Sequence, residues 1–255
     1  MKFSAMVHQL RVLTYIIIKI KNWPEFLYAH LRKSKRLMVV TLRGGLKVLV
    51  RPYMSDVTML METWGMEDYT PPGFKIRSTD IVFDIGGHIG SFSMYAAIKA
   101  TKGKVYSFEP LPENYQIFKS NIEQNKLSNI HLEQKAVSDK GGVGQLFLCK
   151  GTHSGSSSLF YRNTKDTVSI KRITLTDFFE KYKISKVDFM KIDCEGAEYD
   201  ILFSLPKKQL SKIKRISMEY HDTINHHTHR ELIHFFKNNG FKTRLSGEMI
   251  YAIQK

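Results

Sequence analysis

The sequence predicts an α/β fold in which a mostly parallel sheet is covered by helices on both faces. Apolar, β-branched runs at residues 81–85 and 104–108 alternate with amphipathic stretches at 91–99 and 112–125. Repeated strand–helix units of this kind are typical of parallel sheets. A glycine-rich turn at residues 86–90 joins the first run to the first amphipathic stretch, as at the ligand-binding edge of such a sheet.

The second half of the chain continues this pattern and ends in a hairpin. Residues 187–192 and 215–220 are expected to be strands, and residues 197–204 and 228–238 are expected to be helices. Two further runs flank Ser246-Gly247, which predicts an antiparallel hairpin that closes the sheet.

A β insertion at about residues 140–173 interrupts the alternation. It follows an expected strand at 130–137, and the stretches at 145–149 and 167–173 alternate in polarity as strands do. We expect this insertion to lie near the site. Because variable loops often contact substrates, residues 150–166 are expected to contribute acceptor contacts, as is the segment before the main domain.

Capping residues mark two expected helix starts. Thr174 and Asp177 resemble a capping box that opens the helix after the insertion. Closer to the N-terminus, a hairpin at 38–51 precedes a helix at 53–66, with Asp56 as its expected cap.

Residues 1–37 are expected to form an amphipathic helical arm before a main domain at residues 38–255. The arm would consist of one or two helices, broken near Pro24. Its apolar run at 12–20 is shorter than the roughly twenty residues that span a bilayer. Basic and aromatic side chains accompany this run, so the arm either packs on the domain or on a second subunit, or lies on a membrane surface.

The chain of 255 residues carries a formal net charge of +15. Such a charge attracts anionic membranes or polyanions but does not determine the fold. The two cysteines, Cys149 and Cys194, form no CxxC pair, so a reducing cytoplasm is expected rather than a disulfide framework. We expect a cytoplasmic protein with possible peripheral contact at the inner face of the membrane, and no nucleic-acid partner.

Polar side chains follow four of the expected strands at the point where each strand ends. They are Asp84, Glu109, Asp193, and Glu219 with His221. The carboxyl ends of parallel strands lie along one edge of a sheet, where open α/β proteins bind their ligands. The sequence therefore predicts a site at this edge.

The glycine turn and Glu109 predict a nucleotide-like cofactor. Gly86 and Gly90 allow a tight turn and a close ligand approach, and Glu109 stands where a carboxylate accepts both hydroxyls of a ribose. Asp84 precedes the glycines, where it would repel a pyrophosphate but suit an ammonium group. The pattern therefore favours S-adenosylmethionine, which carries an amine, a sulfonium and no phosphate, over NAD.

Four motif blocks add to this reasoning: Asp84–Gly90, Phe108–Pro110, Ala136–Asp139 and Ile192–Glu198. They resemble the successive motifs of FkbM-type methyltransferases over about residues 40–250, and the last block is the most specific. The resemblance implies a Rossmann-like class I methyltransferase fold that uses S-adenosylmethionine. It also implies methyl transfer to a hydroxyl of a sugar, glycolipid, polysaccharide or secondary metabolite.

The resemblance also implies a role for each matching residue. Asp84, Gly86, Gly87 and Gly90 would hold the methionine half of the cofactor, and Glu109 would hold its ribose.

The third block would flank the adenine through Val137 and Ser138. Lys135 stands where many class I enzymes have an acid that binds the adenine amine. Asp193 would line the site and contact the cofactor.

Asp193 and His221 are the candidate catalytic residues, since both are expected beside the position of the methyl group. Methyl transfer is an in-line displacement that depends on orientation, and a hydroxyl nucleophile benefits from a base. Glu219 shares a strand face with His221 and could orient its imidazole.

No metal site is expected. The acids within Asp193–Asp200 could suit magnesium, but turn-bonding and helix-capping roles are favoured for them. The histidines within His226–His229 lack the spaced partners of a zinc site.

Two alternatives stay open at this point. A non-enzymatic adaptor could use the basic charge and the arm to bind an anionic membrane or nucleic acid. An NAD-dependent oxidoreductase would use Glu109 equally well. For the methyltransferase, the acceptor is expected to be a small molecule or a glycan.

Overall fold

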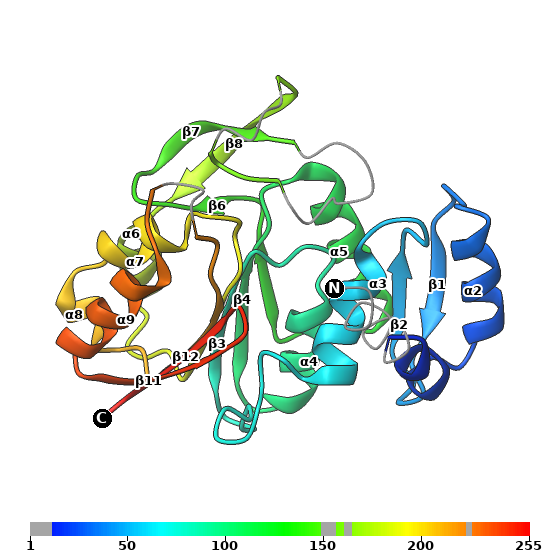
Figure 1. Ribbon diagram of the computed structural model, residues 1–255, viewed down its shortest axis with the longest axis horizontal. Coiled ribbons are helices and arrows are strands. Elements are labelled where there is room, and N and C mark those ends of the chain that lie inside the picture. Colours follow the sequence, from blue (N-terminus) through cyan, green and yellow to red (C-terminus); the bar gives the residue numbers. More distant parts are fainter. Residues whose placement is uncertain (1–11, 149–156, 161–164, 223–225) are drawn as a thin grey trace.

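The fold is built on one mixed sheet of seven strands (Figure 1). The computed structural model describes residues 12–148, 157–160, 165–222 and 226–255. In spatial order the strands are β11 (Phe241–Ser246), β12 (Met249–Gln254), β10 (Arg215–Glu219), β9 (Phe189–Ile192), β3 (Ile81–Ile85), β4 (Lys104–Phe108) and β5 (Ile130–Glu133).

The strand directions confirm the expected fold class. β3 pairs in parallel with β4 and β9, while β12 runs antiparallel to both β10 and β11. From β3 the chain proceeds outward through β4 and β5, and it later returns to β9 on the other side of β3. The order of strands therefore reverses between β3 and β9, which is where open α/β sheets form a ligand crevice at their carboxyl ends.

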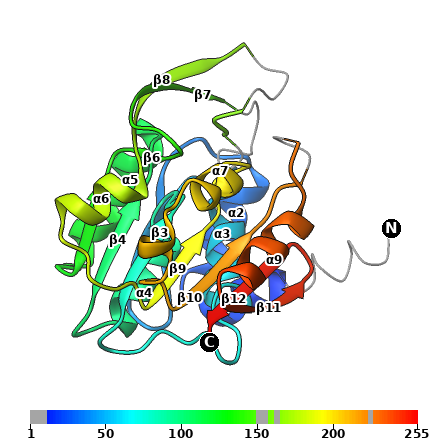
Figure 2. The ribbon, with the colours of Figure 1, turned by 90° about the vertical axis from the view of Figure 1, so that its left-hand side faces the viewer.

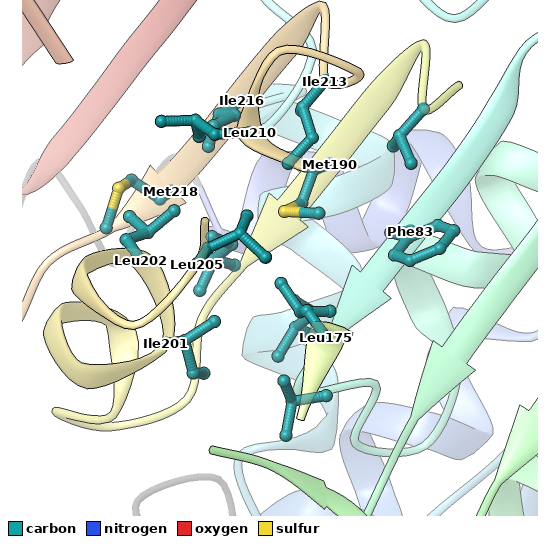
Figure 3. Close-up of a cluster of buried hydrophobic side chains, with 14 of the residues drawn as sticks. Phe83, Leu175, Met190, Ile201, Leu202, Leu205, Leu210, Ile213, Ile216 and Met218 are labelled. Atoms are coloured by element: carbon teal, nitrogen blue, oxygen red, sulfur yellow. The ribbon is translucent and has the colours of Figure 1, made fainter. Parts of the chain in front are cut away.

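Helices cover both faces of this sheet, which explains why its strands read as nearly continuous apolar runs. On one face, Phe83 and Met190 pack with Leu175 and other side chains of the helices that follow the insertion (Figure 3). On the other face, Val82 packs with Phe92 of the first helix after the glycine turn. The helices are α4 (Ser91–Lys99), α5 (Pro112–Gln124), α6 (Leu175–Lys181), α7 (Glu198–Phe203), α8 (Lys207–Leu210) and α9 (His229–Asn238).

The described part of the N-terminal arm packs on the domain. Residues 12–19 are helical, and α2 (Trp23–Leu31) follows after a short break. Pro24 lies in the first turn of α2, where its missing N–H is tolerated. The arm buries Ile16, Ile20 and Phe26 in a core shared with the neighbouring hairpin. Residues 1–11 lie outside the described part of the chain.

The predicted hairpin before the main sheet is confirmed as β1 (Met38–Thr41) and β2 (Lys47–Val50). Its inner strand, β2, is joined to the domain by α5. The N–H groups of Lys47 and Leu49 donate to the side-chain oxygens of Asn125 and Asn121, at 2.9 and 2.6 Å. The hairpin therefore lies beside α5, and α2 lies on its far side at one end of the molecule (Figure 1).

The prediction that Asp56 caps a helix is wrong. The N-cap position belongs to Ser55, and Asp56 lies fully buried inside α3 (Asp56–Leu60). Its carboxylate faces Arg51, with 2.8 Å between Arg51 Nη2 and Asp56 Oδ1. The helix then continues as the π-helix η1 (Met61–Met66), which the sequence pattern did not predict.

The expected strand at 130–137 is also corrected, because it belongs to two sheets. β5 ends at Glu133, and β6 (Ala136–Val137) pairs with β8 (Thr167–Ile173) in a separate sheet. β7 (Gly142–Phe147) completes this sheet in the order β6-β8-β7, and it begins earlier than the expected strand. The small sheet projects beyond one end of the main sheet (Figure 2).

The predicted cap of α6 is confirmed, and α9 has a capping box that was not predicted. The Thr174 side chain accepts a hydrogen bond from the N–H of Asp177 at the start of α6. Thr228 and Glu231 form a complete capping box at α9, which ends before Gly240 with φ +83°.

We expect Asp56→Ala to destabilise the fold by about 3–5 kcal/mol, because it leaves the buried guanidinium of Arg51 without its carboxylate. Glu113→Ala is the matched control. Glu113 also contacts Arg51, at 3.2 Å, but its side chain is 67% exposed, so its loss should cost about 0–1 kcal/mol. Urea unfolding of the variants measures both values. Equal losses would contradict this account of the buried pair.

Candidate active site

A cavity of about 430 Å³ lies at the carboxyl ends of β3, β4 and β9. It brings together four of the predicted site residues, namely Gly86, Glu109, Val137 and Asp193. Segments outside the main sheet complete the wall, as expected of the insertion and the arm. They contribute His30 from α2, Leu146 from β7, and Ser157 and Leu159 from the segment between β7 and β8.

Gly86 is the glycine on which the site's geometry depends. Its φ is +83°, and a Cβ built there would lie 1.8 Å from the carbonyl oxygen of Asp193. Any side chain would therefore push the β3 turn away from the β9 turn. The N–H groups of Gly86 and Gly87 both donate to the carbonyl of Phe108, at 3.2 and 2.9 Å, which joins the glycine turn to the end of β4.

Gly87 and Gly90 have a packing role in the structure. They are not among the described residues that line the cavity. A Cβ at Gly87 would lie 2.7 Å from the ring of Phe118, and one at Gly90 would lie 2.2 Å from it. The two glycines thus let the aromatic ring of α5 pack beneath the turn.

Asp84, a predicted contact of the cofactor, is not among the described residues that line the cavity. It is completely buried, and its Oδ2 accepts a hydrogen bond from Ser93 Oγ at 2.6 Å. Its Oδ1 lies 3.4 Å from the ammonium of Lys191, which also donates to the Gly86 carbonyl at 2.6 Å. Burial raises the pKa of Asp84, and Lys191 and Ser93 oppose this shift. Asp84 therefore supports the turn through Lys191.

Glu109 is held in place by backbone groups. Its Oε2 accepts from the N–H of His88 at 2.8 Å, and its Oε1 accepts from the N–H of Leu111 at 2.9 Å. Burial raises the pKa of Glu109 to about 7, although these bonds favour its charged form. The carboxyl lines the cavity at the end of β4, as a ribose-binding carboxylate would.

His88 is a buried imidazole in the glycine turn. Its φ is +49°, which orients its N–H toward Glu109. Its Nε2 lies 3.6 Å from Asp56 Oδ1. Burial lowers the pKa of His88 to about 4, so the ring is neutral near pH 7.

Asp193 ends β9 within a tight polar network. Its Oδ2 accepts from the Tyr69 hydroxyl at 2.8 Å and lies 3.4 Å from Lys191 Nζ. Burial acts to raise the pKa of Asp193, but the charges of Lys191 and His221 hold it below its usual value. Asp193 is therefore an ionised, well-partnered carboxylate at neutral pH.

His221 does not line the cavity, and its surroundings argue against the predicted role as a general base. Its Nδ1 lies 2.8 Å from Glu198 Oε1, whereas Glu219, the predicted partner, is 3.9 Å from Nε2. Burial acts to lower the pKa of His221, but the bond to Glu198 and the charges of Glu198 and Glu195 raise it to about 10. The imidazole therefore already carries its proton at neutral pH.

The adenine side of the site has a mixed wall. Lys135 and Val137 line the cavity, but Ser138 does not. The Ser138 hydroxyl donates to the carbonyl of Lys140 at 2.7 Å. The ammonium of Lys135 pairs with Glu133 at 2.8 Å. Adenine contacts from this segment would therefore come from Val137 and neighbouring backbone instead of from the Ser138 side chain.

Sequence reasoning missed two residues of the site, Lys191 and Glu62. A lysine inside the apolar run of β9 was the available signal for the first, since a buried ammonium needs paired carboxylates. Glu62 lines the cavity from η1, and the helical pattern around it carried no comparable signal.

The acids and histidines weighed as metal ligands have other partners. Glu198 accepts from the N–H of Cys194 at 3.1 Å and holds His221. His229 Nδ1 lies 2.7 Å from Asp222. Among the residues that the structure describes, no group of three or more His, Cys, Asp or Glu side chains is arranged to hold a metal ion.

The cavity suits an adenosyl cofactor. Its wall combines the buried carboxyl of Glu109 with Gly86, which has no side chain to obstruct a ligand, and with the apolar side chains of Val137 and Leu146. A charged pyrophosphate would meet the ionised carboxylate of Asp193 in the cavity wall. Together, the fold and the site define a methyltransferase that uses S-adenosylmethionine.

The chain belongs to the FkbM methyltransferase family, because residues 84–243 match the model of the methyltransferase FkbM domain. This confirms the resemblance and the expected cofactor, S-adenosylmethionine, and it sets aside the oxidoreductase alternative.

Individual relatives are distant. The chain is 22% identical over 213 residues to the 31-O-demethyl-FK506 methyltransferase FkbM of Streptomyces tacrolimicus, covering 72% of this chain and 81% of that protein. It is 24% identical over 209 residues to the hexuronic acid methyltransferase AglP of Haloferax volcanii, covering 77% and 83%. A crystal structure of methyltransferase FkbM from Methylobacillus flagellatus KT aligns with a TM-score of 0.49 and 15% identity. That alignment covers 72% of this chain and 46% of the other, so this chain spans less than half of that protein.

We expect the affinity for S-adenosylhomocysteine to increase several-fold between pH 6 and pH 8. Ribose hydroxyls donate more strongly to a charged acceptor, and Glu109, with a pKa of about 7, loses its proton in this range. Glu109→Gln should weaken binding by about 1.5–3 kcal/mol at pH 8 and remove the pH dependence. Isothermal titration calorimetry measures both effects. Glu113→Gln, at an exposed position of α5, is the control. Unchanged affinity in Glu109→Gln would contradict ribose binding at this residue.

Proposed function

We propose that this enzyme methylates a hydroxyl group of a small-molecule or glycan acceptor. The observation that carries the proposal is a group of acidic side chains in the cavity wall. They are Asp193, Glu62 and Glu219. A hydroxyl must lose its proton on methylation, and carboxylates can receive it. The name of the Streptomyces tacrolimicus relative, an O-demethyl-FK506 methyltransferase, agrees with methylation of oxygen, and that of the Haloferax volcanii relative, a hexuronic acid methyltransferase, agrees with a sugar acceptor.

In this proposal, Gly86, Glu109 and Val137 hold the cofactor. When bound, S-adenosylmethionine supplies an electrophilic methyl group on a sulfonium. The residues of the protein orient the acceptor, since the acceptor oxygen must be aligned with the bond that breaks. The network of Asp193, Tyr69 and Lys191 would hold the adjacent wall rigid.

The acceptor would be received between the arm and the insertion. His30 and Tyr53 line the cavity from the N-terminal side, and Ser157 and Leu159 line it from the insertion. Much of the predicted contact segment, at residues 150–156 and 161–164, lies outside the described residues. The ionised Asp193 in the cavity wall favours a neutral or amino-bearing acceptor, in contrast to the hexuronic acid named for the Haloferax relative, since an acidic group there would meet like charge.

A panel of methyl glycosides tests this proposal. We expect neutral and amino glycosides to be methylated with a kcat/KM at least about tenfold higher than that of the matching uronide, because the ionised Asp193 repels it. Mass spectrometry detects the added methyl group, and NMR shows whether it is bonded to oxygen. Reactions without S-adenosylmethionine are the control. A methyl group on nitrogen or carbon would contradict O-methylation, and a preferred uronide would contradict the charge argument.

We also propose that the arm holds the enzyme at an anionic membrane surface. Leu13, Ile17 and Ile18, on the helix at residues 12–19, are 37–54% exposed. Basic residues flank them, and Arg43 donates to the carbonyl of Ile18 at 2.9 Å. Apolar side chains among basic ones suit an interfacial helix. None of the helices in the described ranges of the chain is long and apolar enough to cross a membrane.

We expect the protein to float with vesicles that contain phosphatidylserine but not with phosphatidylcholine alone, and binding should fall as salt increases. The double variant Ile17→Glu/Ile18→Glu should lose most of this binding. Val143→Glu, at an exposed apolar position of the insertion, is the control and should not. Failure of the wild type to bind at low salt would refute the membrane proposal and leave the methyltransferase proposal intact.

A further inference from the structure

Glu62 is a cavity-lining carboxyl with an oxygen that is not engaged. It lies in η1 (Met61–Met66), and its Oε2 is buried and accepts no hydrogen bond from any residue that the structure describes. Its backbone carbonyl, in contrast, accepts from the N–H of Asp68 at 2.9 Å. A buried, unsatisfied acceptor is costly in a fold, so the side chain is placed for a partner that arrives in the cavity.

The helix that carries Glu62 is itself unusual. π-helical turns are rare and frequently occur at functional sites. Here Met61 and Thr63 are buried on either side of Glu62, and Trp64 packs edge-on against Tyr95 of α4. These contacts anchor η1 to the domain and leave Glu62 to line the cavity.

Glu62 also belongs to the electrostatic cluster at the acceptor end. Burial raises its pKa to about 8, and the charges of Asp193 and Glu219 add to this shift. A base is most effective when its pKa lies near the working pH. Glu62 therefore changes its protonation state in the range where proton acceptance is useful.

The other described acids of the cavity are less suited to receive a proton. Asp193 is paired with Lys191 and hydrogen-bonded by Tyr69. Glu109 already accepts two backbone hydrogen bonds. Burial raises the pKa of Glu219 to about 7, but Glu219 and Glu195 lie 3.9 and 3.5 Å from the protonated His221. The Oε2 atom of Glu62, in contrast, accepts no hydrogen bond from any residue that the structure describes.

We propose that Glu62 is the general base of the methyl transfer and removes the proton of the acceptor hydroxyl. This inference rests on the proposed O-methylation. An electron pair of the acceptor oxygen forms the new C–O bond. The electron pair of the breaking C–S bond stays on sulfur, and the hydroxyl proton moves to Oε2 of Glu62.

Thermal unfolding at several pH values tests Glu62 without any acceptor. The pKa of Glu62 is about 8 in the fold and near 4.5 when exposed, so between these values only the folded chain keeps the proton. Stability from this group is present at pH 5 and is lost as pH rises through 8. Glu62→Gln should therefore unfold about 5 °C higher than the wild type at pH 8, with little difference at pH 5.

Glu67→Gln is the matched control, since it makes the same change next to the same helix at a partly exposed carboxylate that pairs with Lys75. Its Tm difference from the wild type should not grow in this way between pH 5 and pH 8. A flat Tm difference for Glu62→Gln would overturn the inference, whatever the glycoside panel shows.

Kinetics with the best glycoside of the panel give the second test. We expect kcat of the wild type to rise with pH up to about 8, because the base must be ionised. Glu62→Gln should lower kcat at least about 100-fold and lose this rise. Its affinity for S-adenosylhomocysteine should stay within about twofold, and Glu62→Asp should recover part of kcat. Retention of more than a tenth of kcat, or an unchanged pH profile, would overturn the inference.

If the wild type methylates no hydroxyl, the proposed acceptor class fails, and the proposal that Glu62 removes a hydroxyl proton fails with it. The thermal series then still shows whether Glu62 titrates as described.

Discussion

The buried ammonium of Lys191 is the interaction on which the site depends. It donates to the carbonyl of Gly86 and lies 3.4 Å from the carboxylates of both Asp84 and Asp193. A buried charge must keep its partners, because losing one leaves an uncompensated ion. The turn after β3 and the turn after β9 are thereby tied together, and Gly86 permits the close approach that this requires. The floor of the cavity is thus held together by charge interactions as well as by side-chain packing.

The carboxyls around Lys191 also differ in their pKa values. Asp193, in direct contact with Lys191, has a lowered pKa, whereas Glu62 and Glu219 have raised values of about 8 and 7. Pairs of acids whose surroundings push their pKa values apart are a common way to divide chemical tasks within one site. Here, an ionised Asp193 would hold the geometry, and Glu62 would exchange protons with the acceptor.

Some of the elements around the cavity lie within the matched family region, and others lie outside it. The glycine turn and the strands β4, β5, β9 and β10 belong to the matched FkbM region, residues 84–243, whereas β12 lies beyond it. The helical arm and the β1–β2 hairpin precede it, yet His30 of the arm reaches the cavity wall. The insertion reaches the same wall with Ser157 and Leu159. Acceptor choice in this chain would therefore be decided by elements added around a common catalytic sheet, which is consistent with the distant identity of its relatives.

The elements with local signals could be predicted from the amino-acid sequence alone. β3, α4 and β4 have the predicted bounds, since each depends on a short apolar period and on the glycines between them. The meeting of Glu109 and Asp193 also followed, because parallel strands must end at one edge. Three features could be seen only in the three-dimensional structure. Asp56 pairs with Arg51, Glu198 keeps His221 protonated, and Glu62 lines the cavity. These features arise from contacts between distant segments, and burial among particular charges, which sets each protonation state, is not encoded in any local pattern.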